Sequence, residues 1–102
     1  MDINVQELKE RLDKGEELVL IDVRQPNEHQ EFNVGGKLIP LGTVPLRMDE
    51  ISEDKEAEVV VYCRSGARSG QAKQFLMQNG FSNVRNLQGG MLAWIDAFGV
   101  TK

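Results

Sequence analysis

The sequence predicts an α/β fold in which a parallel sheet carries helices on both faces. Two short runs, residues 18–23 and 59–62, are apolar at nearly every position, which is typical of central strands covered on both sides. Segments with the apolar spacing of helices lie before, between and after these runs, so that helices and strands alternate. A chain of 102 residues, 40% of them hydrophobic, can bury one modest core. We therefore expect a single domain over residues 1–102.

The first half of the chain carries the signals of three helices and two strands. Asn4 followed by Glu7 resembles a capping box, and Gly15 ends the helical pattern that starts there. Each of the two later helices has a proline in its first turn, where proline is well tolerated. The expected elements are, in order, helix 5–14, strand 18–23, helix 26–32, strand 37–39 and helix 45–51.

The second half continues the alternation. Ala72, Phe75 and Leu76 have helical spacing, and Asn79-Gly80 is typical of a left-handed helix end. The expected elements are strand 59–62, a loop that starts at Cys63, the helix that ends at residue 79, strand 84–87, a tight turn at Gly89-Gly90 and a terminal helix over residues 91–98, whose Trp94 packs on the sheet.

The charged residues are unevenly distributed along the chain. The formal net charge is −4, which argues against a nucleic-acid or anionic-membrane partner. Residues 59–95 nevertheless contain Arg64, Arg68, Lys73 and Arg85 and no acidic residue. One interpretation is a solvated helix face, and the other, which we favour, is a binding site for a small anion.

Other classes of protein are excluded by composition. A single cysteine, Cys63, forbids an internal disulfide, and with a single histidine, His29, it cannot form an ordinary zinc site. We expect neither a metal nor a cofactor. The sequence contains no run of about 18 apolar residues, which a membrane span would need. The acidic start of the chain is unlike a secretory signal. These features favour a cytoplasmic protein.

Cys63 is the strongest candidate for a catalytic residue. It stands where the strand 59–62 should end, and ligands of parallel α/β sheets bind beyond the carboxyl ends of the strands. The helix that follows, together with Arg64 and Arg68, should favour a thiolate. A buried structural cysteine is the alternative, but such a residue would have apolar neighbours, and those that follow Cys63 are mostly polar or small.

Residues 63–69, here called the Cys63 loop, resemble the active-site loop of the rhodanese sulfurtransferases. Three further segments resemble motifs of that family in the expected order, so the resemblance covers nearly the whole chain. These segments are Ile21-Asp22-Val23-Arg24 with Glu28 and Phe32, Gly36-Lys37-Leu38 with Val44-Pro45-Leu46, and Leu87-Gln88-Gly89-Gly90 with Ala93-Trp94. Lys37 and Pro40-Leu41 depart from the family pattern, which leaves the path of the middle segment open.

The resemblance implies a doubly wound parallel sheet of about five strands and a Cys63 that carries sulfane sulfur as a persulfide. The donor would be thiosulfate or another small anionic sulfur donor, and the acceptor a thiol, cyanide or a protein. The substrate-binding residues would be Arg64, Ser65, Gly66, Ala67, Arg68 and Ser69.

Asp22 and Arg24 are candidate supporting residues. Asp22 lies near the end of its predicted strand and should reach the same sheet edge as Cys63, where an aspartate close to arginines usually forms a loop-fixing ion pair. We favour that structural role over a catalytic one. His29 is expected to be an exposed or packing residue rather than a catalyst.

Two other functions remain open at this point. Phosphatases and arsenate reductases with the same fold place five residues between the cysteine and the arginine, whereas four separate Cys63 from Arg68. The smaller loop favours a sulfur atom over a tetrahedral phosphate. A rhodanese-like module that only docks or relays sulfur to a partner is the second alternative, and the presence of Cys63 indicates that the chain should at least accept sulfur.

Overall fold

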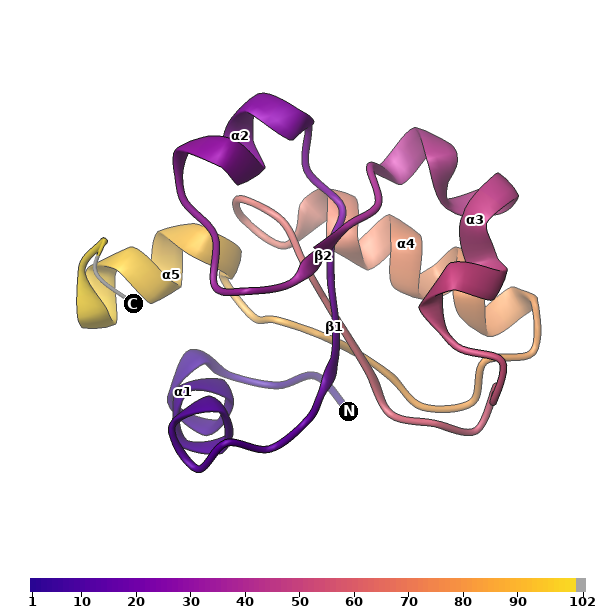
Figure 1. The fold of residues 1–102 in the computed structure, drawn as a ribbon, viewed down its shortest axis with the longest axis horizontal. Helices are drawn as coiled ribbons and strands as arrows, with labels where there is room; N and C mark the ends of the chain where they lie inside the picture. The colour runs from indigo at the N-terminus through magenta and orange to yellow at the C-terminus, as the bar shows by residue number, and fades with distance from the viewer. Residues whose placement is uncertain (101–102) are drawn as a thin grey trace.

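The computed structural model describes residues 1–100, which form a parallel four-stranded sheet with helices packed around it (Figure 1). The strand order is β2-β1-β3-β4, and every pairing is parallel. The elements are, in chain order, α1 (Val5–Asp13), β1 (Val19–Asp22), α2 (Pro26–Glu31), β2 (Lys37–Leu38), the 3₁₀ helix η1 (Leu41–Thr43), α3 (Val44–Ile51), β3 (Val59–Tyr62), α4 (Ala67–Gln78), β4 (Val84–Asn86) and α5 (Gly90–Phe98).

The two faces of the sheet bury two separate apolar clusters. Successive side chains of a strand point to opposite faces. Val59 and Val61 therefore pack with residues of α3 and α4, whereas Val60 and Tyr62 pack with residues of α1 and α5, Trp94 among them. All four residues of β3 are buried, which explains why the run is apolar at every position. The expectation of a parallel α/β fold with helices on both faces is confirmed.

The described chain has four strands rather than about five. The place of a fifth is taken by an isolated parallel bridge between Ile3 and Leu87. The bridge is held by backbone hydrogen bonds from Ile3 N to Asn86 O at 3.1 Å and from Gln88 N to Ile3 O at 2.8 Å. It extends no further because Asn4 already caps α1, accepting a hydrogen bond from the Glu7 backbone at 2.8 Å.

Every predicted helix and strand exists, with ends that differ by a few residues at most. The structure also contains η1, which was not predicted and lies in the middle segment. Thr43 N donates to Pro40 O at 2.8 Å, so one tight turn forms directly before α3. A three-residue turn has no apolar periodicity by which to recognise it.

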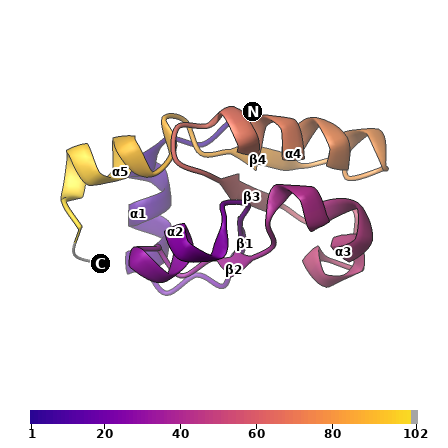
Figure 2. The ribbon, with the colours of Figure 1, turned by 90° about the horizontal axis from the view of Figure 1, so that it is seen from above.

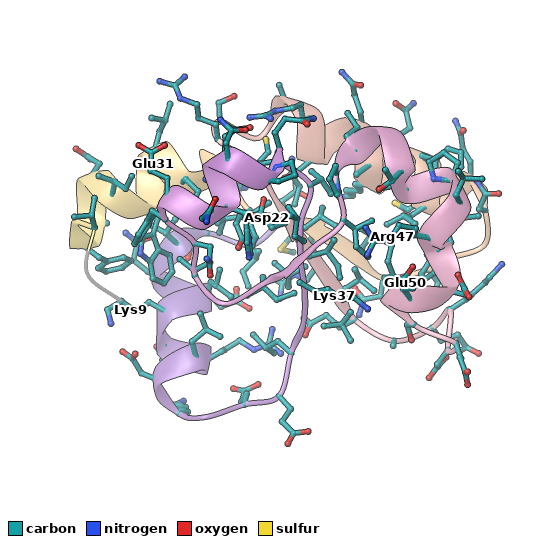
Figure 3. The ribbon with its side chains drawn as sticks, turned by 45° about the horizontal axis from the view of Figure 1, so that its top comes forward. Lys9, Asp22, Glu31, Lys37, Arg47 and Glu50 are labelled. Carbon is teal, nitrogen blue, oxygen red and sulfur yellow. The ribbon has the colours of Figure 1, made fainter. Side chains whose placement is uncertain are left out.

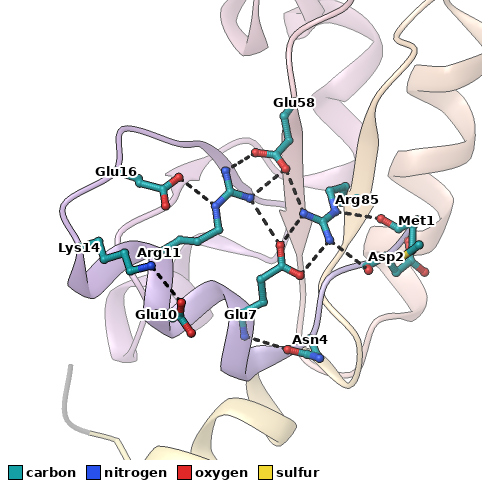
Figure 4. Close-up of polar contacts among 10 residues, drawn as sticks. All are labelled: Met1, Asp2, Asn4, Glu7, Glu10, Arg11, Lys14, Glu16, Glu58 and Arg85. Carbon is teal, nitrogen blue, oxygen red and sulfur yellow. Dashed lines mark hydrogen bonds and ion pairs between the residues drawn. The ribbon is translucent and has the colours of Figure 1, made fainter.

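A network of ion pairs joins α1 to the amino ends of the strands (Figure 4). Arg85 on β4 contacts Glu7 at 2.8 Å and Glu58 at 3.0 Å, and Arg11 contacts Glu58 at 2.6 Å. A smaller cluster joins α3 to β2, where Glu50 contacts Arg47 and Lys37 (Figure 3). No helix within residues 1–100 is both long and apolar enough to span a membrane.

Candidate active site

The site lies at the carboxyl edge of the sheet, where β1 and β3 end side by side. Asp22 and Tyr62 are paired in the sheet, and Cys63 directly follows Tyr62. The Cys63 loop then turns into α4, which begins at Ala67, so that the loop faces the positive end of a 12-residue helix. Figure 2 shows this connection from β3 to α4 at the end of the sheet.

Cys63 is buried, with 1% of its surface exposed, and its sulfur is surrounded by hydrogen-bond donors. Gly66 N donates to Cys63 Sγ at 3.1 Å, and Ser69 Oγ lies 3.3 Å from the same atom. Gly66 has a φ of +105°, a conformation that glycine tolerates best, and at this residue the chain turns from the loop into α4. The loop thus folds its backbone around the sulfur.

These donors favour the ionised thiol. Burial raises the pKa of Cys63, but hydrogen bonds from the Ser69 hydroxyl and from the backbone N–H groups of Ser69, Gly66 and Ser65 lower it, and the net pKa lies below the ordinary thiol value. The largest of the contributions that favour the thiolate come from the Ser69 hydroxyl and the loop backbone. Arg68 also interacts electrostatically with Cys63, since the pKa of Arg68 is raised chiefly by its hydrogen bonds to Glu28 and further by the charge of Cys63. The expected contribution of Arg64 stays a prediction.

Arg68 is occupied by a carboxylate on α2. Its guanidinium forms two bonds to Glu28, at 2.7 and 2.9 Å. This pair holds the pKa of Glu28 at about 2, because Arg68 donates to the carboxylate. Lys73 is likewise paired, with Asp2 at 2.6 Å. The local positive field expected from the acid-free segment is therefore largely neutralised by residues from elsewhere in the chain.

Arg64 differs from these cations. It is exposed and forms no salt bridge with any residue of the described chain, 1–100. Ser65 and Ala67 are also exposed, whereas Ser69 is fully buried. The predicted substrate-binding residues thus divide into three exposed positions on the rim, the half-buried Gly66 and Arg68, and the buried Ser69 beside the sulfur.

Asn86 is a site residue that the sequence analysis missed. Its Nδ2 donates to Gly66 O at 3.0 Å, and its Oδ1 accepts from Ser69 Oγ at 2.6 Å. It fastens the loop at two points from β4, which lies beside β3. The only signal in the sequence is its place near the end of a strand that is parallel to the one before Cys63.

The amino end of α5 supports the loop from behind. Met91 N donates to Cys63 O and Leu92 N to Arg64 O, both at 2.9 Å. Gly90 permits this approach, because it has a φ of +56° and a Cβ there would lie 2.6 Å from Arg64 O. The turn expected at Gly89-Gly90 is present and also positions the reactive segment.

Asp22 organises the neighbouring strand end. Its carboxylate is fully buried and accepts hydrogen bonds from the Arg24 side chain at 2.9 and 2.8 Å. It also lies 2.8 Å from His29 Nδ1 on α2, and Arg24 donates to the Phe32 carbonyl. Figure 3 shows Asp22 beside α2. Asp22 and Arg24 form the ion pair expected of them, and His29 has a polar partner that the sequence analysis did not anticipate.

The fold and the site define a class of protein: a parallel α/β domain in which the loop between a strand and a helix encloses one ionisable cysteine. Comparison with known proteins places the chain within that class. The model of the rhodanese-like domain family matches residues 4–97. The chain therefore belongs to the rhodanese-like domain family.

Several relatives are similar over most of their length. A sulfurtransferase of Allochromatium vinosum is 44% identical over 94 residues, which cover 91% of this chain and 86% of the relative. The thiosulfate sulfurtransferase PspE of Escherichia coli is 43% identical over 70 residues, covering 68% of this chain and 67% of PspE. The crystal structure of a rhodanese-like domain protein from Staphylococcus aureus has a TM-score of 0.82 at 31% identity, covering 92% of this chain and 91% of that one. Sulfur transfer is thus the general activity that the chain shares with its relatives.

Proposed function

We propose that the protein transfers sulfane sulfur from thiosulfate or a related donor to a thiophilic acceptor through a persulfide on Cys63. The observation that carries this proposal is the set of donors around Cys63 Sγ, with Gly66 N at 3.1 Å and Ser69 Oγ at 3.3 Å. The same donors that favour a thiolate favour a persulfide anion.

The loading step starts from the thiolate of Cys63, which the loop donors favour, so the proposal assigns no general base. Cys63 attacks the outer sulfur of thiosulfate, a new S–S bond forms, and the S–S bond of thiosulfate breaks. Sulfite leaves with the bonding electron pair, and the enzyme keeps one sulfur as Cys63–S–S⁻. One thiolate and one dianion thus become one persulfide anion and one sulfite dianion.

The loop residues take complementary roles in this proposal. Arg64 on the rim holds the anionic head of the donor and stabilises the departing sulfite. The N–H groups of Ser65 and Gly66 and the hydroxyl of Ser69 hold the transferred sulfur. Ala67 starts α4, so its N–H has no partner within the helix and adds to the positive edge of the loop. Arg68 orders the loop through Glu28 rather than binding the donor.

Discharge requires an external acceptor. Cys63 is the only cysteine, so no second thiol of the chain can resolve the persulfide. Cyanide attacks the terminal sulfur, the persulfide S–S bond breaks, and thiocyanate leaves as the Cys63 thiolate returns. A small thiol or a thiol-bearing protein acts in the same way. Neither step requires a metal or a cofactor.

The paired state of Arg68 argues against phosphatase or arsenate reductase activity. An oxyanion enzyme of this fold needs the loop arginine to bind the substrate, and here both Nη atoms of Arg68 donate to Glu28. A module that only docks is disfavoured by the prepared thiol, which docking does not need. A relay of sulfur to a partner protein would use the same Cys63 persulfide, with the partner as acceptor.

Steady-state kinetics with thiosulfate and cyanide tests the proposal. We expect Cys63-dependent formation of thiocyanate and no hydrolysis of p-nitrophenyl phosphate. Cys63→Ser should abolish thiocyanate formation and keep the native circular dichroism spectrum, because the change is nearly isosteric at a buried position. Cys63-dependent hydrolysis of the phosphate ester would instead establish that the protein is a phosphatase.

A further inference from the structure

A groove opens between α2 and α5 beside the Cys63 loop. It encloses about 520 Å³, and Arg64 of the loop forms part of its lining. Figure 1 shows α2 and α5 on either side of the connection from β3 to α4. The groove borders the Cys63 loop at Arg64, and its α5 wall is fixed to the loop by backbone hydrogen bonds from Met91 to Cys63 O and from Leu92 to Arg64 O.

The α5 wall of this groove is apolar and open to solvent. Leu92 and Ile95 line it with 46% and 38% of their surfaces exposed, and Phe32 lines the opposite side from the end of α2. Large apolar side chains that remain exposed next to a reactive loop indicate a ligand with an apolar part. Thiosulfate has no such part.

The charges around the groove match a single negative charge. Arg64 is the one cation of the Cys63 loop that no carboxylate of the described residues engages, since Arg68 is bound by Glu28. Arg24 and Glu28 also line the groove but are paired, with Asp22 and Arg68. Glu31 lines it without such a pair among the described residues, so a second negative charge on the ligand would face this carboxylate. A monoanion with an apolar body fits better than an inorganic dianion.

We propose that this groove binds the apolar organic group of a monoanionic sulfane sulfur donor, with the charged head of the donor at Arg64. The proposal rests on the proposed function and names the class of donor that the site prefers. With an alkanethiosulfonate, R–SO₂–S⁻, the Cys63 thiolate attacks the terminal sulfur. The bond between that sulfur and the sulfonyl sulfur breaks, and R–SO₂⁻ leaves with the electron pair. The protein keeps one sulfur as the persulfide anion.

Methanethiosulfonate and hexanethiosulfonate are matched probes, because they differ only in the length of the alkyl chain. With cyanide as acceptor and thiocyanate as readout, we expect the KM for hexanethiosulfonate to be at least about tenfold lower than that for methanethiosulfonate, since the added methylenes are buried in the groove. The kcat values should be similar, since both donors leave the same Cys63 persulfide.

Variants of α5 distinguish binding of the alkyl group in the groove from sulfur transfer at Cys63. Leu92→Gln combined with Ile95→Gln should raise the KM for hexanethiosulfonate about five- to tenfold and leave that for methanethiosulfonate unchanged. Leu46→Gln is the matched control, because Leu46 is 87% exposed on α3 and lies outside the groove. It should change neither KM. Arg64→Gln should raise the KM for both thiosulfonates.

Equal KM values for the two probes in the parent protein would overturn the proposal without any variant having to fold. An equal change in the KM of both probes in the α5 variant would also overturn the proposal. It would indicate instead that Leu92 and Ile95 contact a macromolecule. Failure of the proposed function looks different, because no donor would then give Cys63-dependent thiocyanate.

Discussion

At the scale of single residues, a few hydrogen bonds set the environment of the Cys63 sulfur. Ser69 Oγ lies 3.3 Å from Cys63 Sγ and 2.6 Å from Asn86 Oδ1. Its single proton can serve only one acceptor at a time, so the ionised sulfur competes with the amide oxygen for it. We therefore expect the Ser69 hydroxyl to donate to Cys63 Sγ when the sulfur is ionised and to Asn86 Oδ1 when it is neutral.

Ser69→Ala should raise the pKa of Cys63, because the thiolate loses a hydroxyl donor. At neutral pH the alkylation of Cys63 by iodoacetamide should slow by about three- to tenfold, and the midpoint of the rate against pH should move upward. Ser65→Ala is the matched control, because Ser65 acts through its backbone N–H and the change should leave the pH profile in place. Identical profiles for the parent and Ser69→Ala would contradict this account.

At the scale of elements, α5 and α2 hold the loop by different means. The amino end of α5 contacts the loop backbone through Gly90, where an added Cβ would lie 2.6 Å from Arg64 O. No residue of α2 is buried, and α2 is held by polar contacts, chiefly Glu28 to Arg68 and His29 to Asp22. The first contact is steric and independent of pH, and the second is electrostatic.

Gly90→Ala should lower the free energy of unfolding by about 3 kcal/mol, because it combines a left-handed backbone with a clash against fixed carbonyl groups. Urea unfolding measures the change. Gly15→Ala isolates the backbone contribution, since Gly15 has a φ of +77° with open space around it, and it should cost only about 1 kcal/mol. Equal losses in the two variants would show that Gly90 has no special role behind the loop.

Glu28→Gln should lower the free energy of unfolding at pH 7 by about 1 kcal/mol, because a charge-assisted pair with partly exposed partners is replaced by a weaker one. The folded-state pKa of Glu28 is depressed to about 2, so its contribution is present above the ordinary carboxyl pKa and is lost as the pH falls through about 2. The difference from the parent should therefore shrink in acid. Glu31→Gln on the same helix should show no such dependence, and a constant difference down to pH 2 would refute the assignment.

At the scale of the whole molecule, the uneven charge of the sequence is cancelled by the fold. Each of three cations in the acid-free segment is paired with a carboxylate from residues 1–58. These pairs are Arg68 with Glu28, Lys73 with Asp2, and Arg85 with Glu7 and Glu58. Arg64, the fourth cation, is exposed and has no carboxylate partner within residues 1–100.

Salt dependence of the rate with thiosulfate tests this distribution. The second-order rate should fall less steeply with rising ionic strength in Arg64→Gln than in the parent, because the local attraction is lost while the net negative charge remains. The double variant Glu28→Gln with Arg68→Gln removes a neutral pair and should keep the slope of the parent. A flat slope in the double variant alone would show that Arg68 is the residue that attracts the donor.

Sequence patterns predicted those features that depend on local order. The buried strand Val59–Tyr62, the helix that follows and the position of Cys63 between them are all visible in spacing and residue type. Contacts between distant segments are not visible in this way. The Glu28–Arg68 pair and the Asn86 clamp join residues 40 and 20 positions apart, through side chains that are unremarkable in the sequence. The expected positive field is largely neutralised in the fold, because three of its four cations pair with carboxylates that lie far away in the sequence.

The measurement that tests the central claim most directly is the intact mass of the protein after incubation with thiosulfate, before and after addition of cyanide. We predict a gain equal to one sulfur atom, located on the peptide that contains Cys63, removed by cyanide and absent from Cys63→Ser. An unchanged mass, or a gain that persists in Cys63→Ser, would contradict the claim that Cys63 carries the transferred sulfur.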